Sequence, residues 1–62
     1  MVFALWELRN ARQLTLRQLE EKSGVSKTQI NAIENGKANP RVDTLELLAA
    51  ALEVDITALF KV

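Results

Sequence analysis

The chain of 62 residues carries eight basic and eight acidic side chains and contains neither cysteine nor histidine. This length fits one small domain over residues 1–62, and the missing residue types exclude disulfides and ordinary zinc sites. The apolar opening "MVFALW" gives way to Glu7 and Arg9, too early for a membrane span or a signal-peptide core. We expect no metal, no cofactor and no membrane partner, and a disulfide-free domain of this size suits the cytoplasm.

The first two predicted helices are separated by a capped turn. Apolar residues at helical spacing predict a helix over residues 3–12. Thr15 suits the N-cap of a second helix over residues 16–22, and Gln18 three residues later completes a capping box. Gly24 suits the left-handed cap that ends this helix.

Three more predicted helices follow. Ser26 suits the N-cap of a helix over residues 27–35. The turn "KANPR" leads into residues 42–52, which carry the clearest apolar stripe in the chain. Asp55 suits the cap of a last short helix over residues 56–60. Without any strand pattern, these five helices predict an all-α fold.

The charge is unevenly distributed although the total is zero. Residues 1–41 hold seven Lys or Arg against four acids, a net charge of +3, whereas residues 42–62 hold one against four, a net charge of −3. The chain is therefore polarised, with its basic part available to a polyanion. The neutral total limits binding that ignores sequence, because such binding depends on phosphate neutralisation.

The predicted helix over residues 27–35 has one apolar and one polar face. Ile30 and Ile33 fall on the inner side, and the outer side holds short polar side chains and an alanine. Another surface can approach such a face closely, and its amides, hydroxyls and methyl group suit the base edges of DNA. The same pattern is also typical of an ordinary solvated helix.

The run from Leu16 to Asn35 resembles the helix-turn-helix signature, and "LRNARQLT", "IENGKANP" and "TLELLAAALEV" extend the resemblance to the Xre family. This family includes the DNA-binding domains of phage repressor, Cro and many small bacterial regulators. The resemblance covers about residues 5–60 and implies a compact five-helix, lambda-repressor-like bundle whose third helix enters the major groove. The implied function is a sequence-specific transcriptional regulator, a repressor, that binds a pseudo-palindromic operator in double-stranded DNA as a homodimer.

The resemblance also implies which residues contact DNA. The implied base-reading residues are Lys27, Thr28, Gln29, Asn31 and Ala32. The implied phosphate-contacting residues are Thr15, Arg17, Ser26, Asn35, Lys37 and Arg41. Lys27 suits either role, since a lysine can read guanine or neutralise a phosphate.

Two positions depart from the family pattern. Leu16 stands where the family has a glutamine that bridges a phosphate and the third helix, so Arg17 or Thr15 is left to supply that contact. Glu20 stands where the family has a small alanine. We expect its carboxylate to point outward past the turn.

Arg9 and Glu34 are charged residues among apolar ones on their predicted helices. An unpaired charge in such a position is costly. The resemblance pairs these two positions as a buried ion pair between the first and third helices. We expect the pair to set the third helix against the rest of the domain.

Apolar side chains remain at the two ends of the chain, where Phe3, Trp6, Phe60 and Val62 cluster in the sequence. They suit a lid in which the N-terminus folds over the last helix. They equally suit a dimer interface, because two-fold pairing lets a helix-turn-helix protein recognise a palindrome.

The sequence does not indicate an enzyme. It has no His or Cys, no glycine-rich phosphate loop, and no pair of carboxylates with an obvious cleft. The rival to DNA binding is a protein-interaction module or antitoxin-like partner that uses the same fold without reading DNA. The neutral total charge and the leucine at position 16 favour this alternative.

Overall fold

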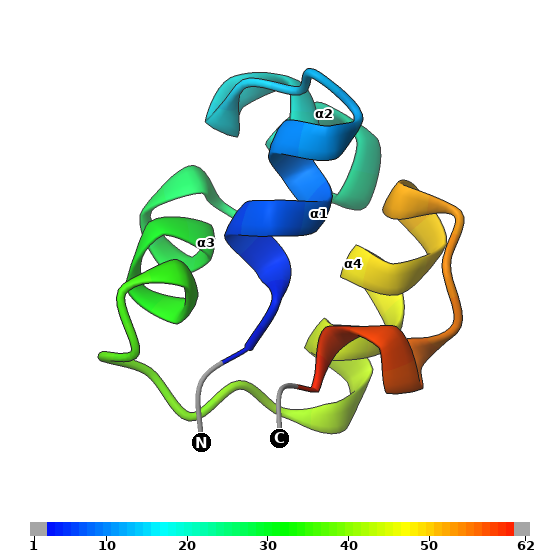
Figure 1. Cartoon of the computed structure of the whole chain (residues 1–62). Coiled ribbons are helices and arrows are strands. Elements are labelled where there is room, and N and C mark those ends of the chain that lie inside the picture. The colour runs from blue at the N-terminus through cyan, green and yellow to red at the C-terminus, as the bar shows by residue number, and fades with distance from the viewer. Residues whose placement is uncertain (1–2, 61–62) are drawn as a thin grey trace.

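Four α-helices and one 3-10 helix make up residues 3–60, the part of the chain that the computed structural model describes (Figure 1). The elements are α1 (Leu5–Ala11), α2 (Leu16–Ser23), α3 (Lys27–Glu34), α4 (Val42–Leu52) and the 3-10 helix η1 (Ile56–Leu59). The fold is all-helical, as the sequence predicts. None of these helices in residues 3–60 is long and apolar enough to cross a membrane.

The fifth predicted helix is wrong in type, and the first is too long at both ends. Residues 56–59 form a 3-10 helix instead of an α-helix, so the described part of the chain has four α-helices and not five. Phe3 lies outside α1 because it forms an isolated antiparallel bridge with Phe60. The amide of Ala4 donates to the carbonyl of Leu59 at 2.8 Å, which draws residues 3, 4 and 60 into extended or turn geometry.

The middle helices begin where the sequence predicts and end within one residue of the prediction. α2 extends to Ser23, one residue beyond the expected end. α3 ends at Glu34 because Asn35 is its C-cap, and the left-handed Gly36 follows with φ 71°. α4 spans residues 42–52 as predicted.

One hydrophobic core receives side chains from every element. Within the described residues, seven large side chains are almost completely buried: Leu5, Leu19, Ile30, Ile33, Leu48, Leu52 and Leu59. Each contributes about 1.5–3 kcal/mol of burial free energy. Since the set includes residues from all five elements, the core joins α2 and α3 to the helices that support them.

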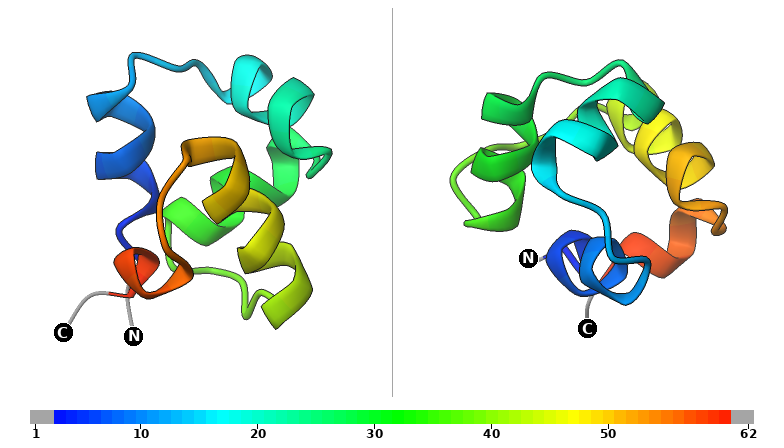
Figure 2. Two further views of the ribbon diagram at one scale, coloured as in Figure 1. Left: turned by 90° about the vertical axis from the view of Figure 1, so that its right-hand side faces the viewer. Right: turned by 90° about the horizontal axis from the view of Figure 1, so that it is seen from above.

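The arrangement leaves one side of α3 at the edge of the molecule. α2 packs against both α3 and α4, and α4 packs against η1. α3 and α4 lie at opposite edges in Figure 1 and in the right-hand view of Figure 2. The outer side of α3 is therefore free to meet another molecule.

Candidate nucleic-acid interface

The turn between α2 and α3 is closed by Gly24 and Ser26. Gly24 adopts the left-handed conformation, with φ 77°, that the sequence predicts for a helix cap. Its amide donates to the carbonyl of Glu20 at 2.8 Å. Ser26 is the N-cap of α3, and its Oγ accepts from the amide of Gln29 at 3.2 Å. α3 therefore starts at a defined point, with three residues between it and the end of α2.

Ser23 adds a contact that the sequence did not predict. Its Oγ donates to the carbonyl of Leu19 at 2.7 Å and accepts from the amide of Val25 at 3.1 Å. The side chain is almost completely buried, so both bonds are shielded from water. A serine directly before the capping glycine is a signal of this contact, because Ser hydroxyls bond readily to nearby backbone.

Glu20 also differs from the prediction. Instead of pointing outward into solvent, its carboxylate turns toward α3, where Oε2 accepts from the amide of Lys27 at 3.0 Å. The first amides of a helix have no acceptor within the helix, and they attract negative charge. The carboxylate therefore occupies the start of α3.

Four of the five predicted base-reading side chains are exposed on α3. Lys27, Thr28, Gln29 and Asn31 are exposed, whereas Ala32 is half-buried. Lys27 and Asn31 are four residues apart, as are Thr28 and Ala32, so each pair shares one side of the helix. Gln29 lies at the flank of this face. The inward side holds Ile30 and Ile33, which are fully buried.

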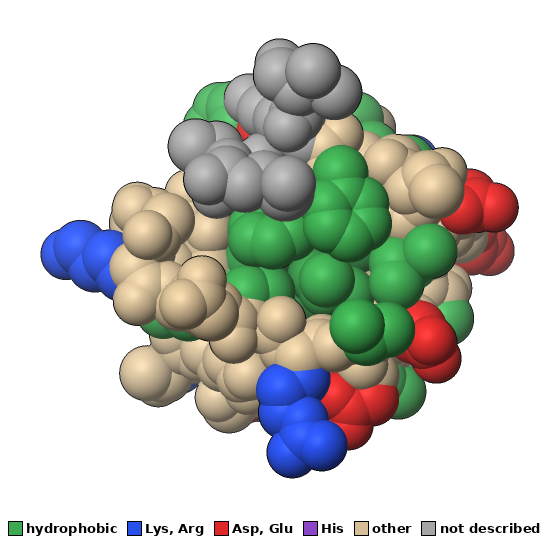
Figure 3. Space-filling model, turned by 90° about the horizontal axis from the view of Figure 1, so that it is seen from below, with side chains coloured by type: hydrophobic (Ala, Val, Ile, Leu, Met, Phe, Trp, Pro, Cys, Tyr) green, Lys and Arg blue, Asp and Glu red, His purple; other side chains and the backbone are tan. Residues whose placement is uncertain are grey.

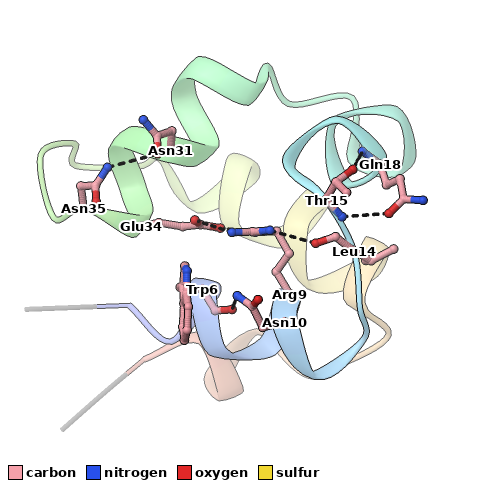
Figure 4. Close-up of polar contacts among 9 residues, drawn as sticks. All are labelled: Trp6, Arg9, Asn10, Leu14, Thr15, Gln18, Asn31, Glu34 and Asn35. Atoms are coloured by element: carbon pink, nitrogen blue, oxygen red, sulfur yellow. Dashed lines mark hydrogen bonds and ion pairs between the residues drawn. The ribbon is translucent and has the colours of Figure 1, made fainter.

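Asn35 continues the row that Lys27 and Asn31 begin. Its Nδ2 donates to Oδ1 of Asn31 at 3.2 Å (Figure 4). The bond holds both amides along the outer side of α3. Asn31 keeps its Nδ2 donors and a second lone pair on Oδ1, so it can still offer both a donor and an acceptor.

The predicted phosphate-contacting residues come from three places in the fold. Thr15 and Arg17 lie at the start of α2, Ser26 lies at the start of α3, and Asn35, Lys37 and Arg41 lie at or beyond the end of α3. Figure 4 shows Thr15 at the opposite end of the domain from Asn35. They therefore form no single cluster, and each would contact a separate part of a long ligand.

Thr15 and Ser26, two of the predicted phosphate-contacting residues, are helix N-caps. Thr15 Oγ1 accepts from the amide of Gln18 at 3.1 Å, and Gln18 Oε1 accepts from the amide of Thr15 at 2.8 Å. This reciprocal pair is the capping box that the sequence predicts. Since the hydroxyls of Thr15 and Ser26 serve these caps as acceptors, each keeps its own proton to donate to a ligand.

Both arginines of the predicted phosphate set have carboxylate neighbours. Arg17 Nε lies 3.3 Å from Glu21 Oε1, and Arg41 Nε lies 3.5 Å from Asp43 Oδ1. All four side chains are largely exposed, and such pairs contribute about 0–1 kcal/mol. A phosphate can therefore compete for either guanidinium.

Lys37 has an exposed side chain on a fixed backbone. Its amide donates to the carbonyl of Ala32 at 2.8 Å, while the amide of Gly36 donates to the carbonyl of Ile33 at 3.1 Å. These two bonds form a Schellman motif at the end of α3. They place the Lys37 side chain directly beyond Asn35.

Arg9 and Glu34 form a nearly buried, two-pronged ion pair (Figure 4). Arg9 Nε donates to Glu34 Oε2 at 2.6 Å, and Nη2 donates to Oε1 at 3.0 Å. Nη1 donates to the carbonyl of Leu14 at 2.8 Å. One guanidinium thus joins α1, the loop before α2 and the last turn of α3.

The apolar residues near the two ends of the chain have features of both roles that the sequence leaves open, a lid over the core and a dimer interface. Phe3 is half-buried and packs on Phe60, with ring centroids 5.6 Å apart, as in a lid. Trp6 and Phe60 remain 54% and 41% exposed, and so stay available to a partner. Val62 lies outside the described residues.

Residues 7–59 match the family profile described as Helix-turn-helix. An uncharacterized HTH-type transcriptional regulator of Bacillus subtilis, RghRB, is 51% identical over 51 residues, which cover 81% of this chain and 37% of that protein. The immunity repressor protein of Bacillus phage phi105 is 38% identical over 52 residues, which cover 84% of this chain and 36% of that protein. The chain therefore spans little more than a third of the length of these curated relatives.

A solved structure shares the fold. It is the restriction-modification controller protein C.AhdI from Aeromonas hydrophila, which superposes with a TM-score of 0.87 and 32% sequence identity. The match covers 90% of this chain and 85% of that chain. The likeness therefore extends over nearly all of both chains.

Proposed function

The chain belongs to the helix-turn-helix family, and we propose that it is a sequence-specific DNA-binding domain of a transcriptional regulator. The observation that carries the proposal is the outer side of α3. It presents short polar side chains at an edge of the molecule, while contacts to α1 and α2 hold the helix in place. In the cytoplasm of a bacterial cell such a domain has direct access to its DNA.

α3 enters the major groove in this proposal. Thr28, Asn31 and Lys27 offer a hydroxyl, an amide and an ammonium group to base edges, and the half-buried methyl of Ala32 suits a thymine methyl. Gln29, at the flank, is placed to read only the edge of the site. A groove-bound helix needs this close approach, and no long apolar side chain on the outer side prevents it.

Phosphate contacts on both sides of α3 would fix its register. Lys37 and Asn35 follow the helix, Ser26 precedes it, and Arg17 and Arg41 can exchange their exposed carboxylate partners for phosphates. These residues belong to the basic part of the chain, which has a net charge of +3. Only the start of α4, where Asp43 pairs with Arg41, lies next to these contacts, and the rest of α4 lies at the opposite edge from α3.

We propose that the working form is a homodimer and that it represses transcription. One recognition helix reads too few base pairs to select a site, whereas two copies read a palindrome. Among residues 3–60, the exposed large apolar side chains are Trp6, Val42, Leu47 and Phe60. On the face seen from below, an apolar area has acidic side chains to its right and an acidic and a basic side chain next to each other below it (Figure 3). A second copy turned by two-fold symmetry would cover such an area.

Selection of bound duplexes from a random DNA pool tests the proposal. We expect an enriched motif with two-fold symmetry, and half-sites about 34 Å apart on one face of the duplex. Enrichment of no sequence would refute DNA reading and favour the protein-interaction role.

A matched pair of variants then tests the assignment of α3. Thr28→Glu places a carboxylate against the base edges and should abolish binding to the enriched duplex while the helical circular dichroism persists. Ala50→Glu adds the same charge on the exposed side of α4, at the opposite edge, and should bind as the wild type does. Equal binding by Thr28→Glu and the wild type would contradict the assignment.

A further inference from the structure

Glu20 holds both sides of the turn that precedes α3. Its backbone carbonyl accepts from the amide of Gly24 at 2.8 Å, and its carboxylate accepts from the amide of Lys27 at 3.0 Å. We propose that Glu20 is a positioning residue, which fixes the first turn of α3 and so decides which bases Lys27 and Thr28 select. The inference rests on the proposed DNA-binding function and adds a specificity-determining residue that itself reads no base.

The contact satisfies a donor that α3 cannot satisfy itself. The amide of Lys27 is the first of the helix, and a carboxylate acceptor there gains from both the ionic hydrogen bond and the helix dipole. Ser26 also caps this turn, through the amide of Gln29. Ser26 is part of the turn itself, however, whereas Glu20 belongs to α2. The hydrogen bond from the Lys27 amide to the Glu20 carboxylate therefore links the start of α3 to the preceding helix.

The neighbouring Glu21 shows what a carboxylate on α2 does without this role. Its side chain is 66% exposed and pairs with Arg17, four residues earlier on the same helix, at 3.3 Å. Glu20 is half-buried, and its bond spans seven residues into the next helix. The two glutamates differ in what they join, although they are adjacent and chemically identical.

α3 is anchored separately at its two ends. Glu34 holds the last turn against α1 through Arg9, and the Schellman motif closes that end. Glu20 holds the first turn against α2. Loss of the Glu20 carboxylate therefore releases Lys27 and Thr28 but leaves Asn31 and Asn35 in place. The expected defect is local to the base pairs that the first turn reads.

Three variants test the inference: Glu20→Ala, Glu20→Gln and Glu21→Ala. Competition binding would use the selected duplex with each base pair changed in turn, and Thr28→Ala would identify the base pairs that the first turn reads. We expect Glu20→Ala to lose about five- to tenfold of the discrimination at those base pairs and none elsewhere. Glu20→Gln should restore most of it, because the amide oxygen still accepts from the Lys27 amide. Glu21→Ala should show the base discrimination of the wild type, because release of Arg17 affects the affinity for every duplex alike.

A merely structural role predicts a different pattern. Lower stability alone would weaken binding to every duplex equally, after correction for the folded fraction measured by circular dichroism. Equal weakening on every duplex would overturn the inference. Unchanged base discrimination in Glu20→Ala, or no recovery of discrimination in Glu20→Gln, would also overturn it. Hydrogen exchange of the Lys27 amide provides a second measurement, since protection should fall in Glu20→Ala and persist in Glu20→Gln.

Failure of the inference is distinguishable from failure of the proposed function. A wild-type protein that enriches no duplex refutes DNA reading, and the specificity role of Glu20 falls with it. A wild-type protein that enriches a motif which Glu20→Ala reads unchanged leaves DNA binding intact and refutes only the role of Glu20.

Discussion

Replacement of Glu34 by alanine should destabilise the domain far more than a change to an exposed charged side chain. The replacement leaves Arg9, whose side chain is only 12% exposed, without two of its three hydrogen bonds. The remaining bond, to the carbonyl of Leu14, does not neutralise the guanidinium. A nearly buried charge without its counter-charge is the costly state.

The expected loss is a large share of the total stability. Breaking one partner of a buried pair costs about 3–5 kcal/mol, and side-chain exposures of 12% and 5% leave little water to reduce that figure. A domain of 62 residues has a free energy of unfolding of about 3–9 kcal/mol. Glu34→Ala should therefore remove at least about a third of the free energy of unfolding, and all of it at the low end of that range.

Urea unfolding followed by circular dichroism measures this loss. The double variant Arg9→Met, Glu34→Leu should recover much of it, because apolar residues of similar volume need no counter-charge. Glu34→Gln, which retains an acceptor oxygen, provides a milder single change if Glu34→Ala is unfolded at all urea concentrations. Glu21→Ala removes the partner of an exposed arginine and should cost at most about 1 kcal/mol. Additive effects in the double-mutant cycle would refute the argument, since residues in contact must show coupling.

Three further predictions concern the surface and the last turn. Lys37→Ala should weaken binding to all duplexes about equally, because one phosphate is no longer neutralised. The slope of log K against log salt concentration should fall in magnitude by about 0.9. An altered consensus at an unchanged slope would place Lys37 among the base-reading residues. Phe60→Ser should shift the protein–DNA complex toward one copy per duplex in analytical ultracentrifugation, because Phe60 is exposed in one copy. Ala50→Ser should leave two copies bound. Two bound copies of Phe60→Ser would exclude Phe60 from the dimer interface. Hydrogen bonds from the amide and then the hydroxyl of Thr57 hold the pKa of Asp55 below its ordinary value of 3.8. As the pH falls, the Asp55 carboxylate is protonated in the unfolded chain before it is protonated in the folded one. Asp55 therefore stabilises the fold at pH values above 3.8, and this stabilisation is lost as the pH falls through the lowered pKa of the folded state. Asp55→Asn should show a smaller loss of stability than the wild type over that acid range in urea unfolding, and an equal loss would contradict the bond.

Local sequence is sufficient to predict the features that depend on neighbours within a few residues. The helix caps are contacts over two or three residues, so residue type and spacing suffice to predict them. They join Thr15 to Gln18, Ser26 to Gln29, and Asp55 to Thr57. The left-handed Gly24 follows from the lack of a side chain at a helix end. The buried Ile30 and Ile33 follow from helical periodicity.

Contacts between segments that the chain brings together from a distance depend on the whole fold. The bridge between Phe3 and Phe60 joins residues 57 positions apart and leaves both outside the helices, and no local pattern encodes it. The bond from Glu20 to the Lys27 amide depends on the direction in which the turn returns the chain. Local propensity cannot predict such contacts, because their free energy is gained only after both segments are fixed by the common core.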